Sequence, residues 1–175
     1  MSADAEFVRY TASVPIMTVE LSTVLDAPPE RIWEAVNRTA LHAYVTRPLL
    51  TFEPVDPPIL PERWEEQEYR VRMKLFGIVP LGWQIVKVER PTTEGASKQI
   101  RDNGRGALIR RWDHLITIEP AGPRRTRYTD WVEVEAGLLT PLVWAFARVF
   151  YAHRQRRWQR LVAHGFRYGG VDPAG

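Results

Sequence analysis

The last third of the chain contains the segment that most constrains the fold. Thr140 followed by Pro141 is typical of a capped helix start, because proline is tolerated at the first helical position. From there the pattern predicts a helix to about Phe166, roughly 39 Å long at 1.5 Å per residue. A helix that is apolar nearly all round has to be buried on most sides, so the rest of the chain must enclose this one. Its first half carries Leu142, Val143, Trp144, Phe146, Val149, Phe150 and Tyr151.

The segments before this helix have the pattern of strands. Apolar residues alternate with polar ones over 17–25 and again over 64–75, which is the period expected of half-buried strands. A later strand is expected to reach Asp102, where the glycine-containing run 102–106 predicts a turn. Turn residues separate each strand from the next, so we expect a sequential antiparallel meander.

Two short helices are expected after the first strand. One follows Pro28 and Pro29 and extends to about Asn37, and Thr39 is expected to cap the second, which must end before Pro48. Together these elements predict an α+β fold. It consists of a curved antiparallel sheet of six to seven strands wrapped around a long C-terminal helix, with two short helices after the first strand.

The domain boundaries follow from where this periodicity begins and ends. We expect a single domain over 16–166, a flexible N-terminal segment over 1–15 and a flexible tail over 167–175. The chain of 175 residues is 45% hydrophobic and 26% charged, a composition typical of a folded domain.

Composition also argues against several classes of site. Charge-free stretches are shorter than the roughly 18 to 20 residues of a membrane span, and no secretory signal pattern opens the chain, so a cytoplasmic location is expected. The chain has no cysteine and its four histidines lack ligand spacing, so no metal is predicted. No phosphate-binding glycine loop occurs either, and no cofactor is expected. The net charge of +3 is too small to predict a nucleic-acid partner.

The order of elements and several local patterns are similar to those of a known superfamily. The combination resembles the START-like superfamily, also called SRPBCC or Bet v 1-like, over about 17–165, and the later patterns resemble its polyketide cyclase/dehydratase-like branch. The resemblance implies a helix-grip fold with an internal cavity for lipids, sterols or polyketides, and cyclase or dehydratase chemistry in some branches. The residues that carry it are 27–33 (APPERIW), 76–83 (FGIVPLGW), Gly106 leading to 112–114 (WDH), and Thr129-Asp130 before Val132.

One pair of residues has the chemistry of an acid/base site. If Ile118 pairs with Thr126, His114 faces Asp130, and directly opposed residues have Cβ atoms roughly 4.5 to 5.5 Å apart. An aspartate that close would hold the imidazole in one tautomer, as general acid/base catalysis requires. The alternative is a satisfied polar pair that stabilises the hairpin.

Further residues are candidates for lining the cavity, because aromatic side chains supply apolar area with a polar end. Arg110 shares the parity of His114 and would neutralise an acidic head group. For each of these residues the alternative is ordinary core packing or, for Arg110, a place on the surface. The candidates are Tyr69, Met73, Trp83, Arg110, Trp112, Tyr128, Phe146 and Phe150.

Three functions remain open at this point. The first is binding of a hydrophobic small molecule between the sheet and the C-terminal helix, by a monomer or weak homodimer. The second is a cyclase or dehydratase that uses His114 and Asp130 as acid/base on an enolisable carbonyl. The third is an interaction protein that uses the arginine-rich second half of the helix, which predicts a steep salt dependence of binding.

Overall fold

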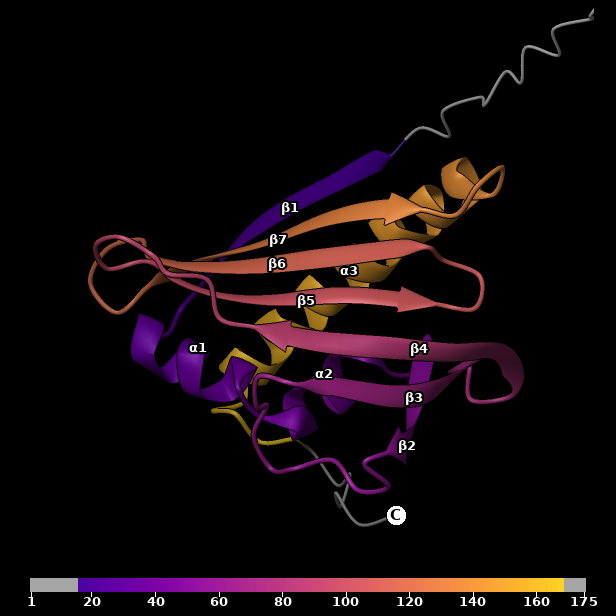
Figure 1. Cartoon of the computed structure of the whole chain (residues 1–175). Coiled ribbons are helices and arrows are strands. Elements are labelled where there is room, and N and C mark those ends of the chain that lie inside the picture. The colour runs from indigo at the N-terminus through magenta and orange to yellow at the C-terminus, as the bar shows by residue number, and fades with distance from the viewer. Residues whose placement is uncertain (1–15, 169–175) are drawn as a thin grey trace, which may run out of the picture.

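The computed structural model describes residues 16–168 and shows a curved sheet that encloses one long helix (Figure 1). The α+β helix-grip architecture is therefore confirmed. In chain order the elements are β1 (Met17–Leu25), α1 (Pro29–Val36), α2 (Thr39–Thr46), β2 (Leu50–Asp56), β3 (Glu68–Leu75), β4 (Val79–Glu89), β5 (Lys98–Gly106), β6 (Arg111–Pro120), β7 (Thr126–Glu135) and α3 (Thr140–Ala163).

The seven strands form one antiparallel sheet in the order β1-β7-β6-β5-β4-β3-β2. Strands β2 to β7 follow one another as hairpins, which confirms the meander, and β1 pairs with β7. Helices α1 and α2 carry the chain from one edge of the sheet to the other. Helix α3 then crosses behind the sheet in the view of Figure 1 and packs against β1, β7 and α2.

The alternation of side chains fixes which face of each strand meets α3. On β6 the side chains of Trp112, His114, Ile116 and Ile118 are all buried at every second position. Successive side chains of a strand point to opposite faces, so these four share the enclosed face. The polar residue in this set, His114, is therefore inside the fold by parity.

Two predicted element boundaries were wrong. Helix α3 ends at Ala163 and not near Phe166. In the expected tail 167–175, Tyr168 is the last described residue, and its ring lies 5.7 Å from that of Tyr44. Strand β5 continues through 102–106, where a turn was expected. Gly104 serves close strand packing there, since a Cβ at this position would lie 2.5 Å from the carbonyl oxygen of Ile85. The expected flexible segment 1–15 lies outside the described residues.

The two threonines expected as helix caps have other partners. The Thr39 hydroxyl donates to the carbonyl oxygen of Pro61 at 2.7 Å. The Thr140 hydroxyl donates to the carbonyl oxygen of Gly137 at 2.7 Å and accepts from the N–H of Ala136 at 2.9 Å. Each is already the first residue of its helix and does not cap it. Thr39 instead binds the β2–β3 connection, and Thr140 binds the turn that leads into α3.

The apolar first half of α3 is less enclosed than expected. Leu142 and Val149 are mainly exposed, whereas Ala147, Phe150 and Tyr151 are buried. The helix therefore has one buried face along its length, and the start of the helix leaves apolar side chains at the surface. This end of α3 adjoins the opening of the internal cavity.

Candidate functional site

A cavity of about 390 Å³ lies between the sheet and α3. Strands β2 to β6 and all three helices supply its walls, which are mostly aliphatic and aromatic. Three lining residues are also more than half exposed: Leu108 at 57%, Leu139 at 51% and Leu142 at 68%. A residue that faces both the cavity and solvent marks an opening, so the mouth lies between the β5–β6 loop and the start of α3.

Half of the expected ligand-binding residues line this cavity. They come from three elements, and all face the space between the sheet and α3. Strand parity and helical spacing were sufficient to place them there. They are Met73 on β3, Trp112 on β6, and Phe146 and Phe150 on α3.

Tyr69 and Tyr128 are core residues behind the cavity wall. The ring of Tyr69 packs 5.0 Å from that of Trp64, and its hydroxyl accepts a hydrogen bond from the N–H of Glu65 at 2.9 Å. The Tyr128 ring packs 5.4 Å from that of Trp158. Both are fully buried and neither lines the cavity, so in these two cases ordinary core packing accounts for the aromatic side chain.

Trp83 and Arg110 lie outside the cavity, and their expected placement was wrong. Trp83 is 39% exposed, and the guanidinium of Arg70 lies over its ring. Beyond Trp83 the β4 residues that line the cavity are Gln84, Val86 and Val88, so Trp83 belongs to the opposite face. Arg110 belongs to the β5–β6 loop; its side chain is 74% exposed and lies 3.9 Å from Glu135. Arg110 therefore cannot neutralise a charge inside the fold.

His114 and Asp130 do meet, although the register that we expected was wrong. In the β6–β7 ladder Ile118 pairs with Tyr128, so His114 stands opposite Val132 and Asp130 opposite Ile116. The two side chains are diagonal neighbours on the same face. Such neighbours remain within reach of long side chains, and Nε2 of His114 lies 2.8 Å from Oδ1 of Asp130.

Asp130 is the centre of a closed hydrogen-bond network. Besides His114, its Oδ1 accepts from the Tyr128 hydroxyl at 3.1 Å, and its Oδ2 accepts from Nε2 of Gln155 at 3.1 Å. Burial alone raises the pKa of Asp130, but the hydrogen bond from His114 and the charge of Arg154 outweigh it, so the pKa lies below its usual value. Asp130 is thus an ionised carboxylate that is fully buried and stabilised by hydrogen bonds from three side chains.

The His114 imidazole is neutral, because burial lowers its pKa more than the hydrogen bond to Asp130 raises it. A neutral ring beside an ionised carboxylate donates from Nε2, which leaves Nδ1 as an acceptor. His114 also lines the cavity. Asp130 therefore fixes one tautomer of His114 and leaves Nδ1 unprotonated. A residue that accepts a proton from a bound molecule requires such a free nitrogen.

Arg154 is a cavity residue that the sequence analysis missed. It lies on α3, is 5% exposed and lines the cavity. We had grouped it with the solvated arginines of the helix. Its position four residues after Phe150 was the available signal, because residues at that spacing share a helix face. By contrast Arg157, three residues on, lies with its guanidinium 4.0 Å from the ring centroid of Tyr44.

Asp102 and His42 also line the cavity and were not expected there. Burial raises the pKa of Asp102 to about 8, and its Oδ1 accepts a hydrogen bond from the N–H of Lys87 at 2.9 Å. Burial, together with the charge of Arg154, lowers the pKa of His42 to about 3. At neutral pH both are uncharged, and the charge of Arg154 acts on the pKa of each.

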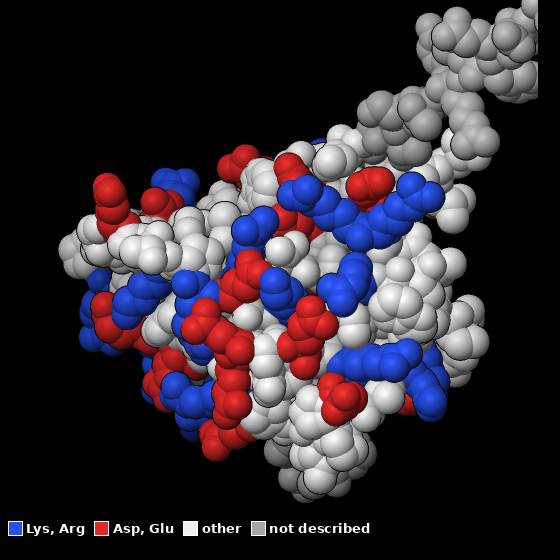
Figure 2. Space-filling model, in the orientation of Figure 1, with Lys and Arg blue, Asp and Glu red and all other residues white. Residues whose placement is uncertain are grey.

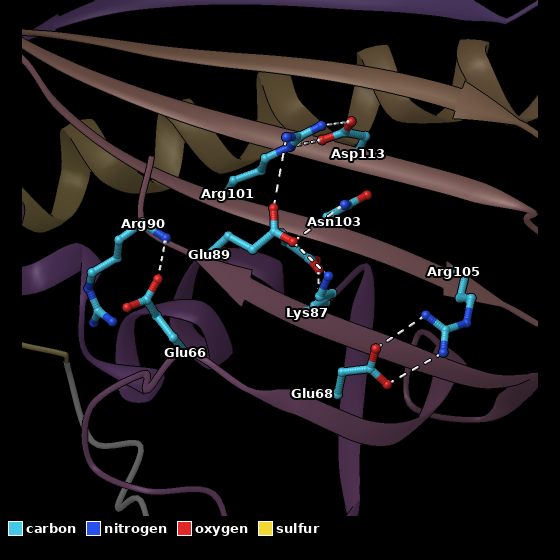
Figure 3. Close-up of polar contacts among 10 residues, drawn as sticks. Glu66, Glu68, Lys87, Glu89, Arg90, Arg101, Asn103, Arg105 and Asp113 are labelled. Atoms are coloured by element: carbon cyan, nitrogen blue, oxygen red, sulfur yellow. Dashed lines mark hydrogen bonds and ion pairs between the residues drawn. The ribbon is translucent and has the colours of Figure 1, made fainter. Parts of the chain in front are cut away.

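The opposite face of the sheet carries paired charges. Figure 2 shows lysines and arginines interspersed with acidic residues over this face, and Figure 3 shows several of the pairs. Nε of Arg101 donates to Oδ1 of Asp113 at 2.7 Å, and Arg105 lies 3.3 Å from Glu68. Mixed and mutually paired charge of this kind is typical of a solvated surface.

Residues 16–168 contain neither a metal-binding cluster nor a membrane-spanning helix. No group of three or more acidic or histidine side chains in this range is arranged to hold a metal ion. Within the same range, no helix is long and apolar enough to cross a membrane.

Comparisons with known proteins place the fold. A family model described as "Domain of unknown function (DUF8410)" matches residues 23–162. No curated protein matches the chain in sequence.

Several solved structures have a similar fold, and the similarity extends over most of this chain and of theirs. The ZhuI aromatase/cyclase from Streptomyces sp. R1128 superposes with a TM-score of 0.61 at 12% identity, covering 89% of this chain and 99% of that one. A START superfamily protein from Mycobacterium smegmatis gives 0.59 at 16% identity, covering 84% and 97%. Truncated norcoclaurine synthase from Thalictrum flavum gives 0.57 at 13% identity, covering 86% and 95%. These likenesses confirm the START-like, Bet v 1-like fold.

Proposed function

The chain belongs to the DUF8410 family, and we propose that it binds a hydrophobic small molecule of the lipid, sterol or polyketide class in the cavity between the sheet and α3. The observation that carries the proposal is the cavity itself. Its volume of about 390 Å³ lies in the range of roughly 300 to 1,000 Å³ that small-molecule sites occupy. Protein interiors contain few voids larger than a water molecule, so a space of this size needs an occupant.

Two of the structurally similar proteins support this proposal. One is an aromatase/cyclase and one is a START superfamily protein. The exposed leucines at the mouth support it as well, because an apolar opening costs solubility and gives an apolar molecule a path inward.

A cavity-filling variant tests the proposal. Val86 is buried on β4 and lines the cavity, whereas Val149 is exposed on α3 and does not. We expect the neutral fluorophore N-phenylnaphthylamine to bind the wild-type protein with an increase in fluorescence. Val86→Phe should weaken that binding about ten-fold or more, since one buried phenyl group removes much of the space. Val149→Phe is the matched control and should bind as the wild type does.

Two results would argue against a binding cavity. One is a wild-type protein that fails to bind the fluorophore; the other is equal binding by Val86→Phe and the wild type. Native mass spectrometry of the purified protein adds an independent reading, because a bound molecule adds its mass to that of the chain.

The second candidate function is a cyclase or dehydratase type of enzyme, and the geometry of His114 favours it. Its ring lines the cavity and is held by Asp130 at 2.8 Å. A base placed there would remove a proton next to a carbonyl group. The test is deuterium exchange at the α-carbon of a β-keto thioester in heavy water. His114→Ala should abolish exchange and leave fluorophore binding nearly intact; a wild-type rate equal to the uncatalysed rate removes this candidate.

A further inference from the structure

The inner cavity contains a buried positive charge that has no ion-pair partner among residues 16–168. Arg154 is 5% exposed, its Nε has no hydrogen-bond acceptor, and no carboxylate of residues 16–168 lies within 4.0 Å of its guanidinium. What surrounds it instead is aromatic. The guanidinium carbon lies 5.8 Å from the ring centroid of Phe150 and 5.1 Å from that of Tyr151.

Two buried acidic groups interact electrostatically with Arg154, and both have hydrogen-bond partners of their own. Asp130 accepts hydrogen bonds from three donors, one of them the Tyr128 hydroxyl that lies beside Arg154. Asp102 accepts from the N–H of Lys87, and its raised pKa of about 8 leaves it protonated at neutral pH. Asp130 thus compensates part of the charge at a distance and Tyr128 faces the guanidinium, but Nε of Arg154 has no hydrogen-bond acceptor among the described residues.

Arg154 is charged although it is buried. Arginine stays protonated in proteins, and a buried charge requires compensation from the charged and hydrogen-bonding groups around it. Burial by itself lowers the pKa of Arg154, and the neighbouring Tyr128 and Asp130 more than offset that effect, so Arg154 is charged. Buried polar groups are nearly always satisfied, which suggests that the missing acceptor belongs to a ligand.

We propose that the ligand of this cavity is an amphipathic carboxylic acid whose carboxylate pairs with Arg154. The inference rests on the proposed binding function and specifies the class of ligand. A guanidinium presents its N–H donors in a planar fork that matches the two oxygens of a carboxylate. The sequence analysis gave the role of neutralising an acidic head group to Arg110, which lies at the surface; Arg154 takes that role inside the cavity.

The geometry also orients the ligand. Leu142 at the mouth and Arg154 are twelve residues apart on α3, which corresponds to roughly 18 Å along the helix axis. The carboxylate therefore lies at the inner end of the cavity. The apolar part extends back toward the mouth, past Phe150 and Phe146.

Matched ligands test the inference on the wild-type protein. Binding is measured by displacement of N-phenylnaphthylamine with decanoate, decanol and decylamine, and with naphthylacetate against naphthylethanol. A charge-assisted hydrogen bond predicts that each carboxylate binds at least about ten-fold more tightly than its alcohol. The amine should bind most weakly because its charge repels Arg154. Carboxylates that bind no better than the alcohols overturn the inference.

Variants locate the effect. Arg154→Met should remove the preference for decanoate over decanol. Its affinity for decanol should stay within about three-fold of the wild-type value, which is a smaller change than the expected ten-fold preference for the carboxylate. Arg156→Gln is the control, since Arg156 is exposed on the same helix and its loss changes the net charge by the same amount. A preference that survives in Arg154→Met, or disappears in Arg156→Gln, overturns the assignment to Arg154.

The outcomes separate this inference from the function on which it rests. If decanol and the fluorophore bind and decanoate gains nothing, the cavity is a binding site and only the carboxylate assignment fails. If none of the compounds binds, both fail. Should Arg154→Met not fold, Arg154→Gln and the wild-type ligand comparison decide the question.

Discussion

Gln155 joins the long helix to the sheet through the carboxylate of Asp130. Its Nε2 donates to Oδ2 of Asp130 on β7 at 3.1 Å and to the carbonyl oxygen of Leu21 on β1 at 2.7 Å. One amide group therefore connects α3 with two adjacent strands. The same carboxylate holds His114, so the stability of the helix-to-sheet contact and the orientation of the imidazole depend on a single charge.

Asp130→Asn should therefore destabilise the protein strongly. The substitution removes the charge that His114, Tyr128 and Gln155 stabilise, and breaking a buried charged network by removing one partner costs about 3 kcal/mol or more. The free energy of unfolding in urea measures the loss. Asp26→Asn is the control, because Asp26 forms an ion pair at the surface with Arg125 at 3.0 Å, and such pairs contribute little. Equal, small losses in the two variants would show that the network is not needed for stability.

The pKa of Asp102 predicts a pH dependence of stability. In the folded protein this pKa is about 8, against an ordinary value of 3.8. Between these two values the folded state holds a proton that the unfolded state has released. Raising the pH therefore favours unfolding, by at most about 1.4 kcal/mol per pH unit.

Asp102→Asn does not titrate and keeps an oxygen acceptor for the N–H of Lys87. We expect the variant to gain stability relative to the wild type as the pH rises from about 4 toward about 8. Thermal melting of both proteins across this pH range measures the difference. Two curves that stay parallel would mean that Asp102 ionises in the folded protein at its ordinary pKa.

Gly104 should not tolerate alanine. A Cβ there would lie 2.5 Å from the carbonyl oxygen of Ile85 and 2.9 Å from Oδ1 of Asp102. The backbones of β4 and β5 would have to separate, and overpacking of this kind costs about 1 to 3 kcal/mol. Asn103→Ala, at the next position on the other face, is the control and should melt close to the wild type. If Gly104→Ala melts with the wild type, the two strands are free to move apart.

Strand parity predicted which residues of β6 face inward, and it failed to predict the register. The expected pairing of Ile118 with Thr126 differs from the observed pairing with Tyr128 by two residues. A shift of two keeps every side chain on its original face, so the hydrophobic pattern fits both registers equally well. The deciding contact is local: the N–H of Ala121 donates to the carbonyl oxygen of Arg125 at 2.9 Å and closes a short loop.

Composition was a poor guide to the charged end of α3. The run of arginines there suggested a solvated face, yet Arg154 is in the cavity and Arg157 lies over the ring of Tyr44. Which arginine is enclosed depends on where α2 and the sheet approach the helix, and those contacts join residues more than a hundred positions apart. The helix itself, by contrast, was predictable from its local pattern.

The distance between the mouth and Arg154 has a consequence for exchange. A ligand carboxylate that enters past Leu142 must lose its hydration water before it reaches the guanidinium of Arg154. On release it must leave the guanidinium before it is hydrated again. Binding and release both cross this dehydration barrier, so the residence time of the ligand should be long even where its affinity is modest. The rates of ligand entry and release would then depend on how the mouth of the cavity opens. Substitutions at Leu108 or Leu139 should change the association and dissociation rates of a ligand more than its Kd.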